Sequence, residues 1–114
     1  MGGREMKVYL SLPISGQPTK ERMDYANQVK QEIECTYRCG WGHFKFEDEL
    51  NIITPFDVCP EPDKPYSYYM GKDIEALLEC DAIYLCEGWQ NSKGCMAEFE
   101  VARIYGKKIM FEKS

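Results

Sequence analysis

The stretch of sequence that decides the fold runs from Ala82 to Glu98 and reads AIYLCEGWQNSKGCMAE. Its first five residues are apolar and the next ones are polar and Gly-containing, which indicates a buried strand and then a tight turn. The small residues after Ser92 favour the start of a helix. If residues 94–105 are helical, each residue turns by roughly 100° and Glu98 lies in the middle of an apolar arc. A carboxylate there is costly unless it is paired, hydrogen-bonded or protonated, so Glu98 is a candidate functional residue.

The other residues of this expected helix divide into two faces. Glu100 and Arg103 fall on the side opposite Glu98, where charges are solvated. The apolar arc is expected to contain Cys95, Ala97, Val101, Ala102, Ile104 and Tyr105.

Outward from this stretch, strands alternate with helices. We expect strands at 7–12, 51–54, 82–86 and 108–111, helices at about 19–37 and 67–79 and from Gly94, and a proline-rich loop at Val58–Tyr66, with Arg38–Leu50 unassigned. In the first helix the residues Met23, Ala26, Lys30, Ile33 and Tyr37 follow 3–4 spacing. Alternation of this kind indicates a parallel sheet covered on both faces. The sequence therefore predicts one α/β domain over residues 1–114, with a Rossmann-like (flavodoxin-like) three-layer architecture and a parallel sheet of four to five strands.

The composition limits the classes of protein to be considered. The hydrophobic and charged fractions, 44% and 29% of 114 residues, are those of a soluble globular domain. A net charge of −5 argues against a surface that binds a polyanion. No run approaches the ~20 apolar residues of a membrane span, and the first residues lack the apolar core of a secretory signal. We expect a cytoplasmic protein that binds neither nucleic acid polymers nor membranes.

The six cysteines have two interpretations. Without a secretory signal they are expected to be free thiols that pack as small apolar residues. Alternatively, Cys35, Cys39 and His43, with Cys59 as a fourth ligand, form a structural zinc site. We favour the free thiols because no CxxC pair accompanies these residues.

Three loops are expected to meet at one edge of the sheet. In parallel sheets, ligands bind beyond the carboxyl ends of the strands, near a switch in strand order. This rule brings together the loops Pro13–Pro18, Pro55–Pro65 and Glu87–Lys93. The first and third enter helices, whose free amides suit a phosphate or another anion. Neither matches GxxxxGK[ST] or GxGxxG, so the sequence gives little support to a nucleoside triphosphatase or a dehydrogenase.

A second carboxylate, Asp73, falls inside the apolar arc expected for helix 67–79. Two helices that each present one inward carboxylate, on either side of strand 82–86, have the arrangement that glycosidic chemistry requires. One carboxylate is ionised, to attack or stabilise the developing oxocarbenium carbon, and the other is protonated, to help the leaving group depart. Burial and mutual repulsion separate two such pKa values.

Three short motifs occur in a fixed order: YLSLPISG at residues 9–16, GKDIE at residues 71–75, and SKG followed by AE at residues 92–98. Together they resemble the nucleoside 2-deoxyribosyltransferase superfamily, and more closely its branch of small bacterial and phage proteins. The superfamily also includes the 2'-deoxynucleoside 5'-monophosphate N-glycosidases. The resemblance spans Val8 to Phe111, with no recognised counterpart for Arg38–Leu50.

The resemblance implies three catalytic residues. Glu98 matches the nucleophilic glutamate, which forms a covalent 2-deoxyribosyl intermediate. Asp73 matches the aspartate that contacts the leaving base or assists its protonation. Tyr9 matches a tyrosine whose hydroxyl orients the nucleophile.

The resemblance also implies a substrate-binding edge. Ser92 and Gly94 match the turn that holds the 5'-phosphate in the monophosphate-cleaving members, and Ser15 and Gly16 occupy the first turn, beside the sugar and phosphate. Trp89, which precedes Ser92, is a candidate wall of the pocket or an interface anchor. The monophosphate hydrolases tend to place an arginine after the first Gly turn, where this chain has QPTK at residues 17–20. Lys20 and Lys93 are the candidate substitutes.

Structural roles for the same residues remain open. Glu98 is then a structural carboxylate bonded to Tyr9 or to a backbone amide, Asp73 a local cap or pair, and Ser92 a helix cap. Asp57, after the second strand, is an alternative acid. The tyrosines at 66, 68 and 69 either stack on a base or provide packing and oligomer contacts.

The sequence thus predicts cleavage or transfer at the N-glycosidic bond of a (deoxy)nucleoside or its 5'-monophosphate, through a covalent glycosyl intermediate on Glu98. Neither a metal nor an organic cofactor is needed, and the expected assembly is a homodimer or a higher homo-oligomer. The alternatives are a non-catalytic protein of the same fold that binds or sequesters a nucleotide, and a small scaffold domain whose Tyr/Trp surface contacts a protein.

Overall fold

The computed structural model of the protein describes residues 5–13, 19–38, 49–58 and 64–112. Its strands are β1 (Glu5–Ser11), β2 (Glu49–Ile53), β3 (Ala82–Leu85) and β4 (Lys108–Phe111). Its helices are α1 (Thr19–Arg38), α2 (Pro55–Val58), α3 (Tyr66–Leu78) and α4 (Lys93–Ile104), with a 3-10 turn, η1, at Trp89–Asn91.

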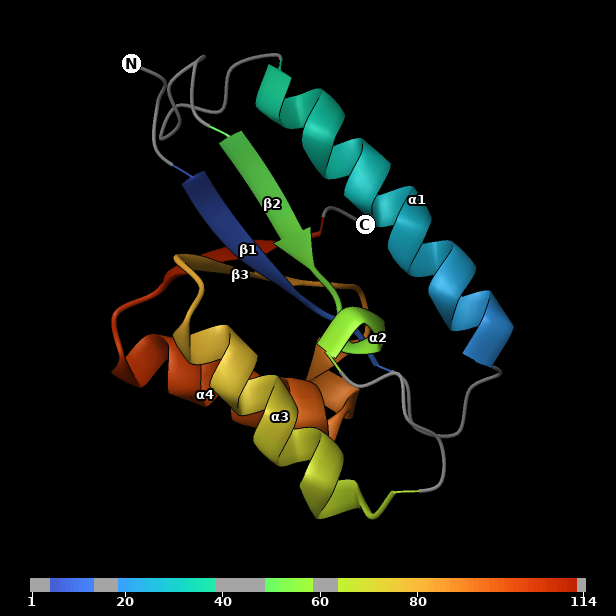
Figure 1. The fold of residues 1–114 in the computed structure, drawn as a ribbon, viewed down its shortest axis with the longest axis vertical. Coiled ribbons are helices and arrows are strands. Elements are labelled where there is room, and N and C mark those ends of the chain that lie inside the picture. Colours follow the sequence, from blue (N-terminus) through green and yellow to red (C-terminus); the bar gives the residue numbers. More distant parts are fainter. Residues whose placement is uncertain (1–4, 14–18, 39–48, 59–63, 113–114) are drawn as a thin grey trace.

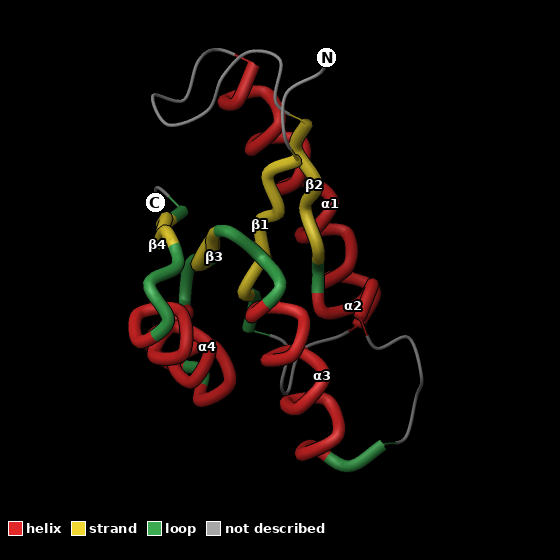
Figure 2. Tube along the Cα trace, turned by 60° about the vertical axis from the view of Figure 1, so that its left-hand side comes forward, coloured by secondary structure: helices red, strands yellow, loops and turns green. Residues whose placement is uncertain are grey.

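The four strands form one parallel sheet in the order β2-β1-β3-β4, as Figure 1 shows. β1 and β3 lie in the middle, and Val8 of β1 pairs with Ile52 on one side and Ala82 on the other. Helix α1 covers one face, and α3 and α4 cover the other (Figures 1 and 2). The predicted α/β fold, Rossmann-like with three layers, is confirmed, with four strands in the described residues.

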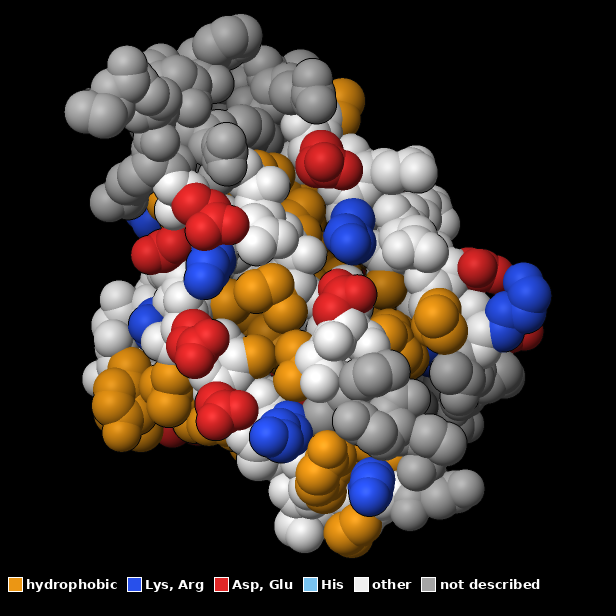
Figure 3. Space-filling view, in the orientation of Figure 1, with side chains coloured by type: hydrophobic (Ala, Val, Ile, Leu, Met, Phe, Trp, Pro, Cys, Tyr) orange, Lys and Arg blue, Asp and Glu red, His pale blue; other side chains and the backbone are white. Residues whose placement is uncertain are grey.

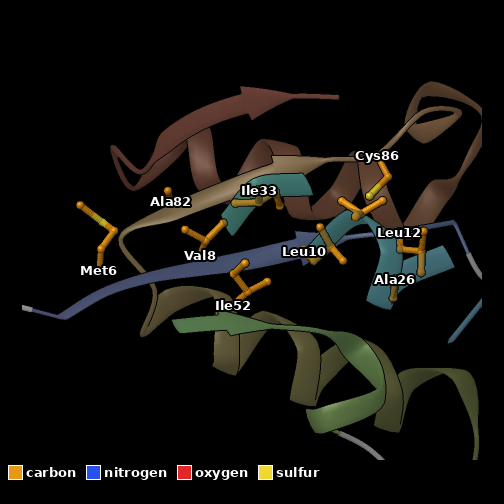
Figure 4. Close-up of a cluster of buried hydrophobic side chains, with 10 residues drawn as sticks. Met6, Val8, Leu10, Leu12, Ala26, Ile33, Ile52, Ala82 and Cys86 are labelled. Atoms are coloured by element: carbon orange, nitrogen blue, oxygen red, sulfur yellow. The ribbon is translucent and has the colours of Figure 1, made fainter. Parts of the chain in front are cut away.

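Side-chain alternation along β1 creates two cores. Met6, Val8, Leu10 and Leu12 point to the α1 face, where Figure 4 shows Val8 and Leu10 directed toward that helix. Their partners from α1 are Ala26, Val29 and Ile33. The odd-numbered residues of β1 point the other way, so that Tyr9 packs with Leu77 of α3 and Ala102 of α4. Because successive side chains in a strand face opposite sides, one strand supplies both layers.

Helical periodicity in the sequence predicted which faces of α1 and α4 are buried, but not how far each buried face extends. On α1, Met23 is 44% exposed, whereas Val29, outside the expected stripe, is fully buried. On α4 the buried residues are Cys95, Glu98 and Ala102. Ala97, Ile104 and Tyr105, which were expected on the apolar arc, are exposed. The buried face of each helix is a narrow stripe. A helical wheel assigns every neighbouring apolar residue to that face, and so it predicts more buried residues than the structure contains.

A short helix, α2, occupies the start of a segment expected to be a loop. Pro55 takes its first position, where a missing N–H costs nothing. Thr54 and Asp57 cap it reciprocally: the Asp57 N–H donates to Thr54 Oγ1, and Thr54 N–H and Oγ1–H donate to Asp57 Oδ2 at 3.1 and 3.0 Å. The carboxylate of Asp57, the alternative acid, is thus engaged in a helix cap.

Glu112, directly after β4, connects the end of this strand to helix α1. The Glu112 carboxylate accepts hydrogen bonds from the Tyr25 hydroxyl of α1 and from the Glu87 N–H in the turn after β3. The turn that precedes α4 is therefore held against α1.

The surface carries charges of both signs. On the described part of the face in Figure 3, Lys and Arg side chains are scattered among Asp and Glu and do not gather into a basic patch. None of the helices in the described ranges is long and apolar enough to cross a membrane.

Candidate active site

Polar side chains from three elements meet beneath the carboxyl end of β1. Tyr9 and Ser11 come from β1, Asp73 from α3 and Glu98 from α4. Tyr9 and Ser11 share a face because they are two residues apart in a strand, and both are fully buried. The two predicted carboxylates are both inward, with 9% of Asp73 and 4% of Glu98 exposed.

Glu98 is held at both carboxylate oxygens. The Tyr9 hydroxyl donates to Oε2 over 3.0 Å, and the Ser11 hydroxyl donates to Oε1 over 2.6 Å. The contact between Tyr9 and Glu98 that the resemblance implies is therefore present. Burial raises the pKa of Glu98 to about 7, the bond from Ser11 opposes the rise, the charge of Asp73 adds to it, and the bond from Tyr9 opposes it.

The carboxyl group of Asp73 has fewer hydrogen-bond donors than that of Glu98. Its Oδ1 atom is buried and has no hydrogen-bond partner among the described residues. Burial raises the pKa of Asp73 to about 7, and the hydrogen-bonding influence of the Tyr9 hydroxyl opposes this rise. The pKa values of both carboxyl groups are thus raised from their ordinary values. Each carboxyl group is also close enough to Tyr9 for the hydroxyl to influence its pKa.

The hydroxyl protons distinguish the two carboxyl groups. Burial and the neighbouring carboxylates raise the pKa of Tyr9 well above its ordinary value, so the phenol keeps its single proton. That proton is directed to Glu98, as is the proton of Ser11. The Tyr9 hydroxyl has one proton, and while that proton is donated to Glu98 it is not donated to Asp73. The arrangement therefore favours an ionised Glu98 beside a protonated Asp73.

The start of α4 packs closely on α3. Ser92 caps α4, because its Oγ accepts from the Cys95 N–H over 3.3 Å. A Cβ added at Gly94 would lie 3.3 Å from the Tyr66 hydroxyl oxygen and 3.6 Å from the Met70 sulfur, so glycine permits this approach. Ser92 and Gly94 thus lie at the N-terminal end of the helix that carries Glu98.

The turn before α4 approaches the end of β1. Gly88 has a φ of 89°, a left-handed conformation that glycine adopts without strain. A Cβ built there would lie 3.7 Å from Cγ of Pro13. The meeting of the first and third loops expected at this edge is therefore present at Pro13 and Gly88. Ser15 and Gly16 lie outside the described residues.

Trp89 lies in an aromatic cluster and packs against the core that contains Tyr9. Its ring centroid lies 5.0 Å from that of Phe99 in α4 and 5.8 Å from that of Phe111 in β4. These ring contacts anchor η1 to the second layer and the edge strand.

The cysteines whose environment is described are free thiols, with Cys80, Cys86 and Cys95 buried and Cys35 exposed. The other members of the alternative zinc site, residues 39, 43 and 59, lie outside the described residues. Within the described ranges no group of three or more His, Cys, Asp or Glu side chains is arranged to hold a metal ion.

Two residues near the site were missed by sequence reasoning. Ser11 was recognisable as a hydroxyl on the same strand face as Tyr9. Arg22, in the first turns of α1, donates from Nη1 to the Pro13 carbonyl over 3.3 Å and lies over the Tyr25 ring. Its buried Nε has no partner among the described residues. Lys20, a candidate substitute for the arginine of the monophosphate hydrolases, forms an exposed salt bridge with Asp24.

Comparison with known protein families gives a match over most of the chain. A family model described as "Domain of unknown function (DUF4406)" matches residues 6–111, which include both helices that carry the carboxylates. No curated protein matches the chain.

Proposed function

The chain belongs to the DUF4406 family, and from its carboxylate pair we propose that it cleaves or transfers the N-glycosidic bond of a (deoxy)nucleoside or its 5'-monophosphate. The observation that carries the proposal is the asymmetry between the two buried carboxyl groups. Glu98 receives two hydroxyl donors, whereas Oδ1 of Asp73 receives none from the described residues. Retaining glycosidic chemistry needs one ionised and one protonated carboxyl group in a single site.

The proposed reaction has two steps. In the first, Glu98 attacks the anomeric carbon and the C–N bond breaks, so that its electron pair goes to the base, which takes the proton of Asp73. The product is a glycosyl ester of Glu98 beside an ionised Asp73. In the second, Asp73 takes a proton from water as the water oxygen attacks the anomeric carbon and frees the Glu98 carboxylate. Attack by a second base in place of water gives transfer.

Each residue has one task in this reaction. Tyr9 donates to Oε2 of Glu98 and orients the carboxylate. The desolvated environment of Asp73 keeps its proton available near neutral pH, where a general acid is effective. No step requires a metal or an organic cofactor.

Two features support an anionic substrate group at this edge. The N-terminus of α4 begins at Ser92, next to the helix turn that carries Glu98, and helix N-termini favour negative charge. Arg22 places a guanidinium group against the end of β1. A 5'-monophosphate is the substrate group that fits both, and Arg22→Gln is expected to lower turnover of monophosphates more than that of nucleosides.

The proposal extends to assembly and location. We place the protein in the cytoplasm as a homodimer or a higher homo-oligomer. Exposed apolar side chains of α4 and β4, including Ile104, Tyr105 and Phe111, are available for contact between copies. Size-exclusion chromatography with light scattering measures the assembly.

The test is chromatographic release of free base from nucleosides, deoxynucleosides and their 5'-monophosphates. Glu98→Gln is expected to lower turnover by roughly 10³-fold or more, and Asp73→Asn by roughly 10²–10⁴-fold. Glu100→Gln and Glu75→Gln are matched controls, because each removes an exposed carboxylate from the same helix. Both controls should retain full turnover.

The other outcomes separate the competing functions. Added acceptor base distinguishes transfer from hydrolysis. Ligand-dependent thermal stabilisation without base release would favour the nucleotide-binding function. A folded protein that shows neither would reject both and favour a scaffold.

A further inference from the structure

Ser11 is a fully buried hydroxyl at the carboxyl end of the central strand β1. A hydroxyl in such surroundings is costly unless it is hydrogen-bonded. Its partner is Oε1 of Glu98, over 2.6 Å. A distance this short is typical of a hydroxyl that donates to an ionised oxygen, the stronger class of hydrogen bond.

The Cys95 thiol lies beside Ser11. Burial raises the pKa of Cys95, with hydrogen bonding to the hydroxyls of Ser11 and Ser92 opposing the rise, so the thiol stays protonated. Because an ionised carboxylate can only accept, the single Ser11 proton is donated to Oε1 of Glu98. The hydroxyl is therefore aimed at Glu98 before any ligand arrives.

The described groups around Glu98 offer it no cation. The titratable groups that face it are Tyr9 from β1, Asp73 from α3 and Cys95 from its own helix, and no Lys or Arg in the described ranges shifts its pKa. Hydroxyl donors therefore take the place that a cation fills in an ordinary buried ion pair. Of the two donors, Tyr9 influences the pKa of both carboxyl groups, whereas Ser11 influences that of Glu98 and not that of Asp73.

We propose that Ser11 is a positioning residue of the glycosidic reaction, which holds Oε1 of Glu98 in place and keeps this carboxylate in its ionised, attacking form. This inference rests on the proposed function. Tyr9 and Ser11 lie two residues apart on β1. Each donates to a different oxygen of Glu98, so the two bonds together prevent the carboxylate from rotating. The sheet supplies a rigid base for both donors, because Tyr9 is paired with both β2 and β3 and Ser11 is paired with β3.

The experiment compares wild type with Ser11→Ala, which removes one oxygen and leaves the backbone unchanged. The ionisation midpoint of Glu98 is followed by NMR with ¹³C-labelled carboxyl groups, and its signal is identified by its loss in Glu98→Gln. Removal of one charge-assisted bond is expected to raise the midpoint by about one pH unit. The acid limb of the kcat profile should move by the same amount, with turnover below this midpoint about tenfold lower and KM little changed.

The matched control is Thr54→Val. Thr54 is a buried hydroxyl at the end of the neighbouring strand β2, and its partner is Asp57 rather than Glu98. This variant should leave the Glu98 midpoint where it is in wild type. Ser11→Cys keeps the side-chain volume with a weaker donor, and its midpoint should lie between those of wild type and Ser11→Ala.

The failure of this inference and the failure of the proposed function have different signatures. An unchanged Glu98 midpoint in Ser11→Ala would overturn the role of Ser11, even if wild type releases base. If Ser11→Ala does not fold, Ser11→Cys decides in the same way. Absence of base release by wild type would reject the glycosidic function, and the titration would still report whether Ser11 holds Glu98.

Discussion

Asp73 is buried with less compensation than Glu98. Its Oδ1 atom lacks a hydrogen-bond partner among the described residues, and the carboxylate of Glu98 lies near enough for the two charges to interact. Burial raises its pKa from 3.8 to about 7, so the folded protein holds this proton more tightly than the unfolded chain. Stability linked to Asp73 is therefore complete below pH 4 and falls as pH rises to about 7, because the unfolded chain releases the proton first. The site thus reduces the stability of the fold at neutral pH.

At the scale of the residue, we predict that Asp73→Asn stabilises the protein at pH 8. The amide removes a buried charge, so the free energy of unfolding should rise by about 2–4 kcal/mol at pH 8 and by much less at pH 4.5. Urea denaturation at the two pH values measures the difference. Glu75→Gln, an exposed change on the same helix, should alter stability by less than about 0.5 kcal/mol at either pH. A destabilised Asp73→Asn at pH 8 would mean that the ionised carboxylate is paired in the folded protein.

At the scale of the element, α4 illustrates what a local pattern specifies. Its buried stripe of Cys95, Glu98 and Ala102 follows the 3–4 spacing of a helix, and Glu100 pairs with Arg103 on the outside. The inward direction of Glu98 was therefore predictable. The exposure of Ile104 was not, because it depends on whether another element covers the last turn of the helix.

The capping of α4 gives a second prediction. Ser92→Ala removes the acceptor for the Cys95 N–H and should lower the free energy of unfolding by about 1 kcal/mol, whereas Ser92→Asp should retain the cap. Ser67→Ala is the matched control, since the cap position of α3 is Pro65 and makes no side-chain bond. Urea denaturation of the three variants measures the effect. Equal losses for Ser92→Ala and Ser67→Ala would show that the Ser92 cap contributes nothing.

At the scale of the whole molecule, the strand order places the site on the best-buried part of the sheet. β1 carries Tyr9 and Ser11; it pairs with β2 over Glu5–Tyr9 and with β3 over Val8–Ser11. Residues from both core clusters lie on this strand, so its displacement would open both layers. The donors to Glu98 thus lie on a central strand of the sheet.

This arrangement predicts a gradient of amide exchange. Backbone amides at the centres of β1 and β3 should exchange most slowly, through global unfolding, and those of the edge strand β4 should exchange faster by about tenfold or more. Native-state hydrogen exchange followed by NMR measures the gradient. Equal protection of Ile83 and Ile109 would instead indicate that the sheet opens as one unit, or that a partner covers β4.

The sequence by itself determined which elements form and which way their side chains face. Strands alternating with helices predicted the parallel sheet, and helical spacing predicted that Asp73 and Glu98 turn inward, because both patterns are local. The cap formed by Thr54 and Asp57 was missed, since Pro55 was taken only as the end of a strand. Local patterns do not specify which residue of another element stands opposite.

The resemblance implied Tyr9 as a partner of Glu98, but only the tertiary structure showed the second donor, Ser11, and the oxygen that each donor meets. The donors Tyr9 and Ser11 are 89 and 87 residues away in sequence, and their positions depend on how α4 packs across the sheet. That packing directs two hydroxyl protons to Glu98 and leaves Oδ1 of Asp73 without a donor among the described residues. A helical wheel gives two equivalent buried carboxylates, whereas the three-dimensional placement of the hydroxyl donors makes them chemically different.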